Sequence, residues 1–211
     1  MTEPRQSPRI RYDEGCLAAH ALNVVGDRWA LLVARELMLT PKRFQAIRRG
    51  LPGVTAAVLT QRLGQLAEAG VVAQGAGLYA LTDSGRGLMP VLQAMCRWGA
   101  LHPGHDPRRF ISPTALIISM TAMIRPTPAH AVAGLVMGDE AFTLHLTGDG
   151  ILRPRAGADP TAGFVLSGNG NDLARAVYGP APLSDLARNG TIGLTGDAAA
   201  AQDFVDLFGL R

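Results

Sequence analysis

The sequence is poor in cysteine and in lysine. Among its 211 residues there are two cysteines, Cys16 and Cys96, and one lysine, Lys42. Two cysteines are too few for the disulfide framework that stabilises many small secreted proteins. The first 13 residues are polar and lack the apolar stretch of a secretion signal. We therefore expect a protein of the reducing cytoplasm.

Long apolar runs are also absent. No run approaches the roughly 18 residues that a membrane-spanning helix needs, so we expect no membrane span. Hydrophobic residues nevertheless make up 47% of the chain and charged residues 18%, a composition that favours packed cores over disorder. A chain of this length fits two small domains or one larger one.

Charge is distributed unevenly along the chain. Residues 1–109 contain 14 Lys and Arg against 8 Asp and Glu, a net charge of +6, whereas residues 110–211 contain 6 against 9, a net charge of −3. A basic half suits a polyanionic partner, although small domains often differ by a few charges. The dominance of arginine suits bidentate contacts to phosphate and guanine, and it is also typical of a GC-rich genome.

The composition changes near residue 102. Residues 102–111 are charged and rich in proline and glycine, so they are interpreted as a linker. We expect one domain over 1–101, a second over 112–211, and an α+β fold class. The first domain is expected to be helical with one hairpin, and the second to combine helices with a sheet.

In the first domain, helical periodicity and capping residues set the expected elements. Asp27 is expected to cap the second helix, Thr40 with Pro41 the third and Thr55 the fourth, and Pro90 to bend the last. The expected helices are 13–25, 27–39, 42–49, 55–69 and 82–99, and the expected hairpin strands are 71–73 and 78–81.

This order of helices and hairpin is typical of a helix-turn-helix with a wing. In the helix over 55–69, Leu59, Leu63 and Leu66 form the stripe that faces the core. The opposite face is short, polar and free of negative charge until Glu68, which suits close approach to the major groove of double-stranded DNA. An ordinary solvated helix face is the alternative. The residues expected on the outward face are Thr55, Ala56, Ala57, Thr60, Gln61, Gly64 and Gln65.

Several cations lie on neighbouring predicted elements. Arg43 and Arg62 are the preferred candidates for phosphate contacts, which position a protein on DNA without reading its sequence. Further candidates are Arg28, Lys42, Arg48 and Arg49, although cations at the end of a helix also complement its dipole.

A set of short motifs follows in order along the first domain: Cys16, Gly26-Asp27-Arg28-Trp29, Leu31-Leu32-Val33, Arg43-Phe44, Leu51-Pro52-Gly53-Val54, Val58-Leu59-Thr60-Gln61-Arg62-Leu63, Leu66 with Gly70, Tyr79, Leu81-Thr82, Gly85-Arg86 and Trp98-Gly99. With these motifs, residues 16–99 resemble the HxlR-type winged-helix regulators. The resemblance implies a homodimer built from the first and last helices, with paired recognition helices, residues 55–69 here, in successive major grooves.

Two positions depart from the family pattern. The predicted wing, residues 74–77, is short and carries no Arg or Lys, which argues against wing contacts to DNA here. Leu17 stands where the family commonly has proline after the cysteine. Some members sense oxidants through that cysteine, so Cys16 is a candidate redox site, with a small buried apolar residue as the alternative.

In the second domain, alternating and helical patterns predict a mixed architecture. Phe142, Leu144 and Leu146 are expected on one face of a strand, and Thr143, His145 and Thr147 on the other. The expected helices are 112–124, 171–178, 183–189 and 197–208, and the expected strands are 131–137, 141–147, 151–154, 163–167 and 191–195.

A second set of motifs lies in the C-terminal part of the chain: 163–166, Asp172-Leu173, Tyr178-Gly179, Leu186, 190–197, Phe204 and Leu207. On these motifs, residues 112–208 resemble the sterol-carrier-protein-2-like fold. It implies an apolar small molecule or lipid held between sheet and helices. Apolar residues expected to line such a cleft, or alternatively to form the core, are Met120, Met123, Phe142, Phe204, Leu207 and Phe208.

No pattern indicates catalysis. Residues 168–172 lack the third glycine of a dinucleotide loop, and His102 and His105 have no evident third metal ligand nearby. We therefore expect no enzyme, cofactor or metal. The sequence predicts a homodimeric, sequence-specific DNA-binding transcriptional regulator modulated by an apolar ligand. The alternative is a lipid or small-molecule carrier whose first domain serves dimerisation.

Overall fold

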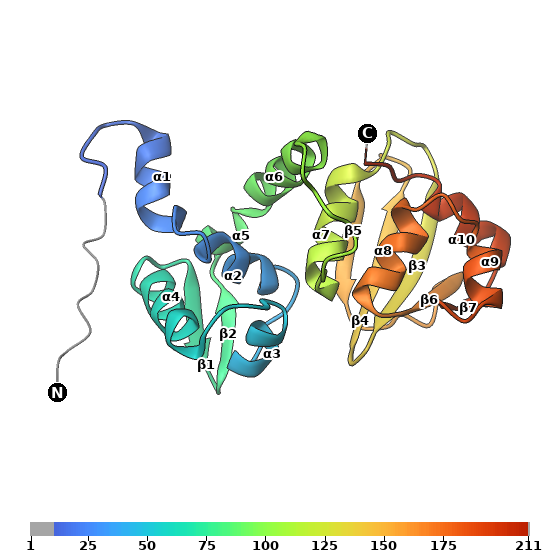
Figure 1. The fold of residues 1–211 in the computed structure, drawn as a ribbon, viewed down its shortest axis with the longest axis horizontal. Coiled ribbons are helices and arrows are strands. Elements are labelled where there is room, and N and C mark those ends of the chain that lie inside the picture. The colour runs from blue at the N-terminus through green and yellow to red at the C-terminus, as the bar shows by residue number, and fades with distance from the viewer. Residues whose placement is uncertain (1–10, 211) are drawn as a thin grey trace.

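The computed structural model describes residues 11–210 and contains two hydrophobic cores (Figure 1). One core is formed by residues between Val25 and Leu81, and the other by residues between Leu116 and Phe208. We refer to residues 11–101 as the N-terminal unit and to residues 112–210 as the C-terminal unit. The polar segment before residue 11 lies outside the described residues.

The N-terminal unit consists of short helices and one two-stranded sheet. In chain order its elements are α1 (Leu17–Val25), α2 (Ala30–Glu36), α3 (Phe44–Arg49), α4 (Ala56–Glu68), β1 (Val72–Gly75), β2 (Leu78–Leu81), α5 (Asp83–Arg86) and α6 (Met89–Leu101).

The predicted fourth helix is confirmed as α4. The Thr55 hydroxyl accepts a hydrogen bond from the amide of Val58 and thereby caps the first turn. Leu59, Leu63 and Leu66 are buried, as their spacing predicts. The helix ends before Gly70, which takes a φ of 69° that suits glycine. The core stripe therefore fixes which face of α4 points outward.

The third helix begins later than predicted. Arg43 is its N-cap and Phe44 its first residue, so the expected start at Thr40 and Pro41 is wrong. Lys42 is instead in extended backbone, because its amide and carbonyl both pair with Tyr79 of β2, at 3.0 and 2.9 Å. This pairing adds a third backbone segment to the wing.

The predicted last helix of this unit is divided in two. Thr82 caps α5 by accepting a hydrogen bond from the Gly85 amide, and the chain turns at residues 87–88 before α6. Pro90 lies in the first turn of α6, where a missing N–H costs nothing, so it begins a helix rather than bending one. The wing turn is tighter than predicted, with Ala76 and Gly77 at its tip.

The C-terminal unit consists of a five-stranded sheet with helices on one face (Figure 1). The strand order is β5-β4-β3-β6-β7, with β3 and β6 parallel and the other neighbours antiparallel. Its elements are α7 (Pro113–Met123), β3 (His130–Met137), β4 (Glu140–Thr147), β5 (Leu152–Ala156), β6 (Phe164–Gly168), α8 (Gly170–Tyr178), α9 (Leu183–Arg188), β7 (Gly193–Gly196) and α10 (Ala198–Val205). Each predicted helix and strand of this part has a counterpart here.

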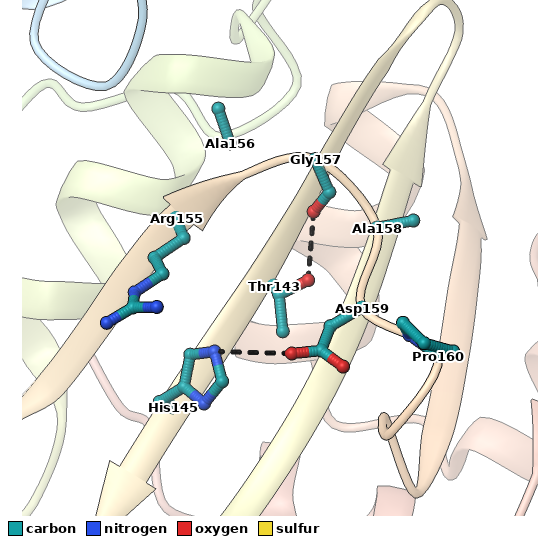
Figure 2. A pocket seen from close by; sticks show the side chains of 8 residues that line it. All are labelled: Thr143, His145, Arg155, Ala156, Gly157, Ala158, Asp159 and Pro160. Atoms are coloured by element: carbon teal, nitrogen blue, oxygen red, sulfur yellow. Dashed lines mark hydrogen bonds and ion pairs between the residues drawn. The ribbon is translucent and has the colours of Figure 1, made fainter.

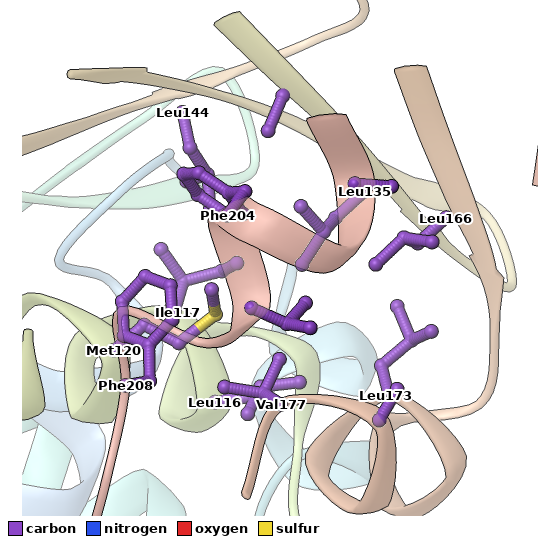
Figure 3. Close-up of a cluster of buried hydrophobic side chains, with 14 of the residues drawn as sticks. Leu116, Ile117, Met120, Leu135, Leu144, Leu166, Leu173, Val177, Phe204 and Phe208 are labelled. Carbon is purple, nitrogen blue, oxygen red and sulfur yellow. The ribbon is translucent and has the colours of Figure 1, made fainter. Parts of the chain in front are cut away.

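The core of this unit lies between the sheet and the helices (Figure 3). The predicted alternation along β4 is confirmed for Phe142, Leu144 and Leu146, which are buried against α7 and α10 side chains. Thr143 on the other face is also buried, and its hydroxyl is satisfied by donating a hydrogen bond to the carbonyl of Gly157 at 2.8 Å.

The two units are in contact through helices α6 and α7, which pack along each other. The Gln93 side chain of α6 donates a hydrogen bond to the Thr121 hydroxyl of α7 at 3.0 Å. Within residues 11–210, no helix is both long and apolar enough to cross a membrane.

Candidate nucleic-acid interface

The outward face of α4 is accessible and uncharged. Thr55, Ala56, Ala57, Thr60 and Gln61 are exposed, and so is the glycine one turn further along. Their side chains are small or polar, and Glu68 at the last position is the first acidic residue of the helix. A surface of this kind can approach base edges in a major groove closely without repelling the phosphates on either side.

Arg62 is held by partners within the N-terminal unit. Its Nε lies 2.6 Å from Oδ1 of Asp27, and its guanidinium also donates to the side-chain oxygen of Gln65. Asp27 in turn accepts a hydrogen bond from the Trp29 amide at the start of α2. Only 18% of the Arg62 side chain is exposed. Its ion pair with Asp27 therefore connects α4 to the start of α2. Gln65, half-buried beside it, belongs to the same contact.

Arg43 is exposed at the N-cap of α3 and lies beside the wing tip. Its guanidinium comes within 3.6 Å of the position that a Cβ would take on Gly77. The wing carries no Lys or Arg, as the sequence shows, so Arg43 places a cation at the edge where the wing has none. Among the other candidates, Arg28 lies over the ring of Trp29, 5.8 Å from its centroid.

The remaining cations near α3 divide into exposed and buried groups. Arg48 and Arg49 are exposed in its last turn, and Arg49 pairs with Asp139 at 3.3 Å. Lys42 is buried, with 6% of its surface exposed, and points to the C-terminal unit. The expectation that Lys42 contacts phosphate is therefore wrong, because its ammonium group lies inside the protein.

Exposed apolar side chains gather on α1 and α6. Leu17 and Leu22 of α1 are exposed, and α1 projects from the body of the N-terminal unit in Figure 1. On α6, Trp98 is 67% and Leu101 76% exposed. The remaining members of the exposed α6 stripe are Val91 and Met95. A soluble chain seldom leaves so much apolar surface uncovered unless another molecule contacts it.

The two cysteines lie at these same helices but differ in environment. Cys16 is exposed at the N-cap of α1, so the alternative of a small buried residue does not describe it in the single chain. Cys96 is half-buried on α6. Burial raises the pKa of the Cys96 thiol, and the nearby Arg35 and Arg97 only partly oppose that effect.

Known proteins match the same part of the chain. The family model of the HxlR-like helix-turn-helix matches residues 24–106. An uncharacterized HTH-type transcriptional regulator of Methanothermobacter thermautotrophicus is 31% identical over 98 residues, which are 43% of this chain and 75% of that protein. The uncharacterized regulator YkvN of Bacillus subtilis is 34% identical over 86 residues, 37% of this chain and 73% of that protein. The chain belongs to the HxlR-like helix-turn-helix family.

A solved structure of the quinone-bound YodB from B. subtilis is similar to part of the chain at 32% identity. The alignment covers 40% of this chain and 97% of that chain, with a TM-score of 0.38. The HxlR-like match ends at residue 106, so the C-terminal unit lies outside it.

Outside the HxlR-like match, the C-terminal unit contains a cavity with a volume of about 920 Å³. It opens between α8, α9, α10 and the last residues, and apolar side chains such as Val177, Leu183 and Val205 form much of its wall. Of the six residues predicted to line a ligand cleft, Phe208 lines this cavity. Met120, Phe142 and Phe204 are packed in the core with it, and Met123 and Leu207 are half-buried.

A smaller cavity of about 280 Å³ lies on the other face of the sheet and has polar walls (Figure 2). His145 Nε2 and Asp159 Oδ2 face each other across it at 4.0 Å. Hydrogen bonds from the hydroxyl and amide of Thr161 lower the pKa of Asp159, and His145 and Arg155 add smaller effects. This cavity was not predicted, because its residues come from two strands and the loop that follows them.

Proposed function

We propose that the protein is a homodimeric, sequence-specific DNA-binding transcriptional regulator, and that α4 of each copy enters a major groove. The observation that carries the proposal is the exposed face of α4, where Thr55, Ala56, Ala57, Thr60 and Gln61 present no charge. Membership of the HxlR-like family and its HTH-type regulator relatives support the same function.

Direct readout is assigned to the polar residues of this face. Thr60 and Gln61 bring hydroxyl and amide groups that hydrogen-bond base edges, and Ala56 and Ala57 can contact thymine methyl groups. Arg43 is assigned to phosphate, because it is exposed at the N-cap of α3 beside the wing tip. Arg62 pairs with Asp27 and donates to Gln65, so these two residues of α4 are assigned to holding the helix against the start of α2.

The dimer is assigned to α1 and α6. The exposed apolar side chains of these two helices would be buried by contact with the same surface of a second copy in a two-fold interface. A two-fold dimer of this kind places two α4 helices against two half-sites, about 34 Å apart along the duplex.

The test is selection of binding sites from random duplex DNA, followed by affinity measurement. We expect an inverted repeat with half-sites one helical turn apart. Thr60→Ala and Gln61→Ala should each lower affinity for that site by about 1–3 kcal/mol while sparing nonspecific binding. Thr195→Ala, an exposed threonine on β7, is the matched control. Failure to select any common site would contradict sequence-specific binding.

We further propose a domain division at 1–101 and 112–211, with 102–111 as linker and a sterol-carrier-protein-2-like second domain. The mixed sheet with helices on one face, and the cavity among α8, α9 and α10, favour that type of domain. The wall combines apolar side chains with polar ones such as Gln202 and Ser184, which suits a largely apolar small molecule with a polar group; such a molecule would modulate DNA binding from this domain.

The second candidate function is a lipid or small-molecule carrier in which the N-terminal domain serves dimerisation, and the cavity is the observation that favours it. The probe is the dye anilinonaphthalene sulfonate, an aromatic sulfonate that binds apolar surfaces, and Ala199→Trp should block its binding because Ala199 lines the cavity. Ala200→Trp, on the exposed side of the same helix, is the control. Dye binding without any selected DNA site would favour the carrier, and dye binding equal in both variants would contradict the ligand site.

A further inference from the structure

The one lysine of the chain is buried where the two units meet. We propose that Lys42 is a positioning residue for DNA binding: with Glu36 and Glu140 it forms a latch by which the C-terminal unit holds the helix-turn-helix in place. The proposal rests on the DNA-binding function proposed above. It assigns a role to the contact between the units.

The ammonium group of Lys42 is surrounded by groups from both units. Its Nζ lies 2.7 Å from Oε2 of Glu140, at the start of β4, and donates to the Thr114 hydroxyl of α7 at 2.9 Å. From the N-terminal unit, Oε2 of Glu36 accepts at 3.4 Å. Glu36 is completely buried and Lys42 nearly so, whereas 28% of the Glu140 side chain is exposed, so the cluster reaches the surface only at Glu140.

Glu36 makes a second connection between the units. Its Oε1 accepts a hydrogen bond from the Ser112 hydroxyl, the N-cap of α7, at 2.6 Å. The same oxygen accepts from Nη2 of Arg35 at 2.8 Å, and Arg35 also donates to the carbonyl of Gly50 at 3.2 Å. A Cβ on Gly50 would overlap the Glu36 carboxylate, so that carboxylate packs directly on the backbone where α3 ends.

The cluster therefore contacts α3 at both ends. Lys42 comes two residues before its first residue and Gly50 directly after its last. A short turn joins α3 to α4, and the Lys42 backbone is paired with Tyr79 of the wing. Groups of the C-terminal unit thus help to fix the position of α3, the first helix of the helix-turn-helix. Because α4 follows α3 directly, they also help to fix the outward face of α4.

The energetics of buried charge make the latch testable. Removing one partner of a buried ion pair leaves the other charge uncompensated, whereas removing both partners together is far less costly. The exposed pair Arg49–Asp139 also joins the two units, but its side chains are 71% and 79% exposed. Exposed pairs of that kind contribute little, so this pair is the matched control.

The first measurement is DNA affinity as a function of salt, with the full chain and the selected DNA site. Lys42→Met should weaken binding about tenfold, within the usual range for coupled sites. Its slope of log affinity against log salt should equal that of the unaltered protein, because Lys42 does not reach phosphate. Arg43→Gln should by contrast reduce the slope by about 0.9, the value for one lost phosphate contact.

The second measurement is amide hydrogen exchange of α3 and of the first turn of α7. Lys42→Met should speed exchange at both, while the amides of α10 keep their protection and report that the C-terminal core remains folded. The double variant Lys42→Met/Glu140→Gln should recover most of both the affinity and the protection. Asp139→Asn, which breaks the exposed pair and leaves the Arg49 cation in place, should change neither.

Three outcomes would overturn the latch: unchanged affinity and exchange in Lys42→Met, a loss of salt slope equal to that of Arg43→Gln, or no recovery in the double variant. Failure of the proposed function is distinguishable from these. If the unaltered protein binds no DNA, the exchange measurement and its recovery still decide whether the cluster joins the units.

Discussion

Arg43 and Arg62 flank the same helix-turn-helix, yet their surroundings give them different roles. Arg43 is exposed beside the wing tip, whereas Arg62 pairs with Asp27 and supports α4. Identical side chains on two successive helices are therefore expected to respond differently to substitution. The difference lies in what each guanidinium contacts.

Arg62→Gln and Asp27→Asn should have the same effect, because each removes the same ion pair. We expect each to lower the free energy of unfolding by about 1 kcal/mol, since the pair is only partly buried. The salt dependence of DNA binding should be unchanged in both variants. Urea unfolding and salt titrations check this, and a reduced salt slope in Arg62→Gln alone would assign Arg62 to phosphate instead.

Cys96 is expected to be a slow thiol. Burial raises its pKa, so at any given pH a smaller fraction is thiolate, the reactive form, than in an exposed cysteine. In the Cys16→Ser variant, alkylation of Cys96 by iodoacetamide should become significant only above the pH at which a free cysteine reacts. Unfolding in urea should restore the ordinary rate. A folded-state rate equal to that of a free cysteine would contradict the burial.

The residue-scale roles that sequence could predict are those set by local spacing. Thr55 as a cap and the buried Leu59, Leu63 and Leu66 follow from positions within one helix. The partners of Arg62 and Lys42 could not be predicted, because Asp27, Thr114 and Glu140 are distant in sequence. In the sequence alone, a buried lysine cannot be distinguished from one at the surface.

At the scale of elements, the wing turn carries a measurable strain. Ala76 has a φ of 50°, a left-handed conformation that costs a residue with a side chain about 1 kcal/mol relative to glycine, and Gly77 follows at 74°. Ala76→Gly should therefore leave stability unchanged or raise it by up to about 1 kcal/mol. Gly77→Ala should lower it by a similar amount. Thermal unfolding of the two variants checks the sign, and destabilisation by Ala76→Gly would contradict this turn geometry.

Element order could be predicted from sequence, but two boundaries could not. The third helix starts late because the Lys42 backbone pairs with Tyr79, which is a tertiary contact. The chain turns between α5 and α6, so the predicted helix over 82–99 becomes two. The periodicity of apolar residues continues across such a turn, so it does not reveal the break.

The exposed stripe of α6 leads to a prediction about assembly. Trp98→Glu places a charge in the proposed dimer contact, where it would be desolvated without a partner, and should convert the dimer to monomer at micromolar concentration. Sedimentation velocity measures the change. Phe110→Glu, an exposed aromatic outside α1 and α6, is the control. A Trp98→Glu protein that remains dimeric would assign the interface elsewhere.

At the scale of the whole molecule, α6 and α7 connect the proposed dimer contact to the C-terminal core. Helix α6 carries the exposed stripe and also packs on α7, where Gln93 hydrogen-bonds Thr121. The Ser119 hydroxyl of α7 hydrogen-bonds the hydroxyl of Tyr178, at 2.9 Å, and Tyr178 lines the cavity of about 920 Å³. Sequence predicted both units, but the contacts between them depend on pairs that no local pattern relates.

This continuity predicts a reciprocal effect between the cavity and DNA. If anilinonaphthalene sulfonate binds the cavity and changes DNA affinity by some factor, the selected DNA site must change dye affinity by the same factor, because both describe one coupling free energy. We expect a factor between about 5 and 150. Ser119→Ala should reduce this factor, since the variant removes the hydrogen bond to Tyr178 without altering a residue of the C-terminal core. Fluorescence titrations of dye with and without DNA, and of DNA with and without dye, measure both sides. Equal affinities in all four titrations would show that the cavity and the DNA-binding face are independent.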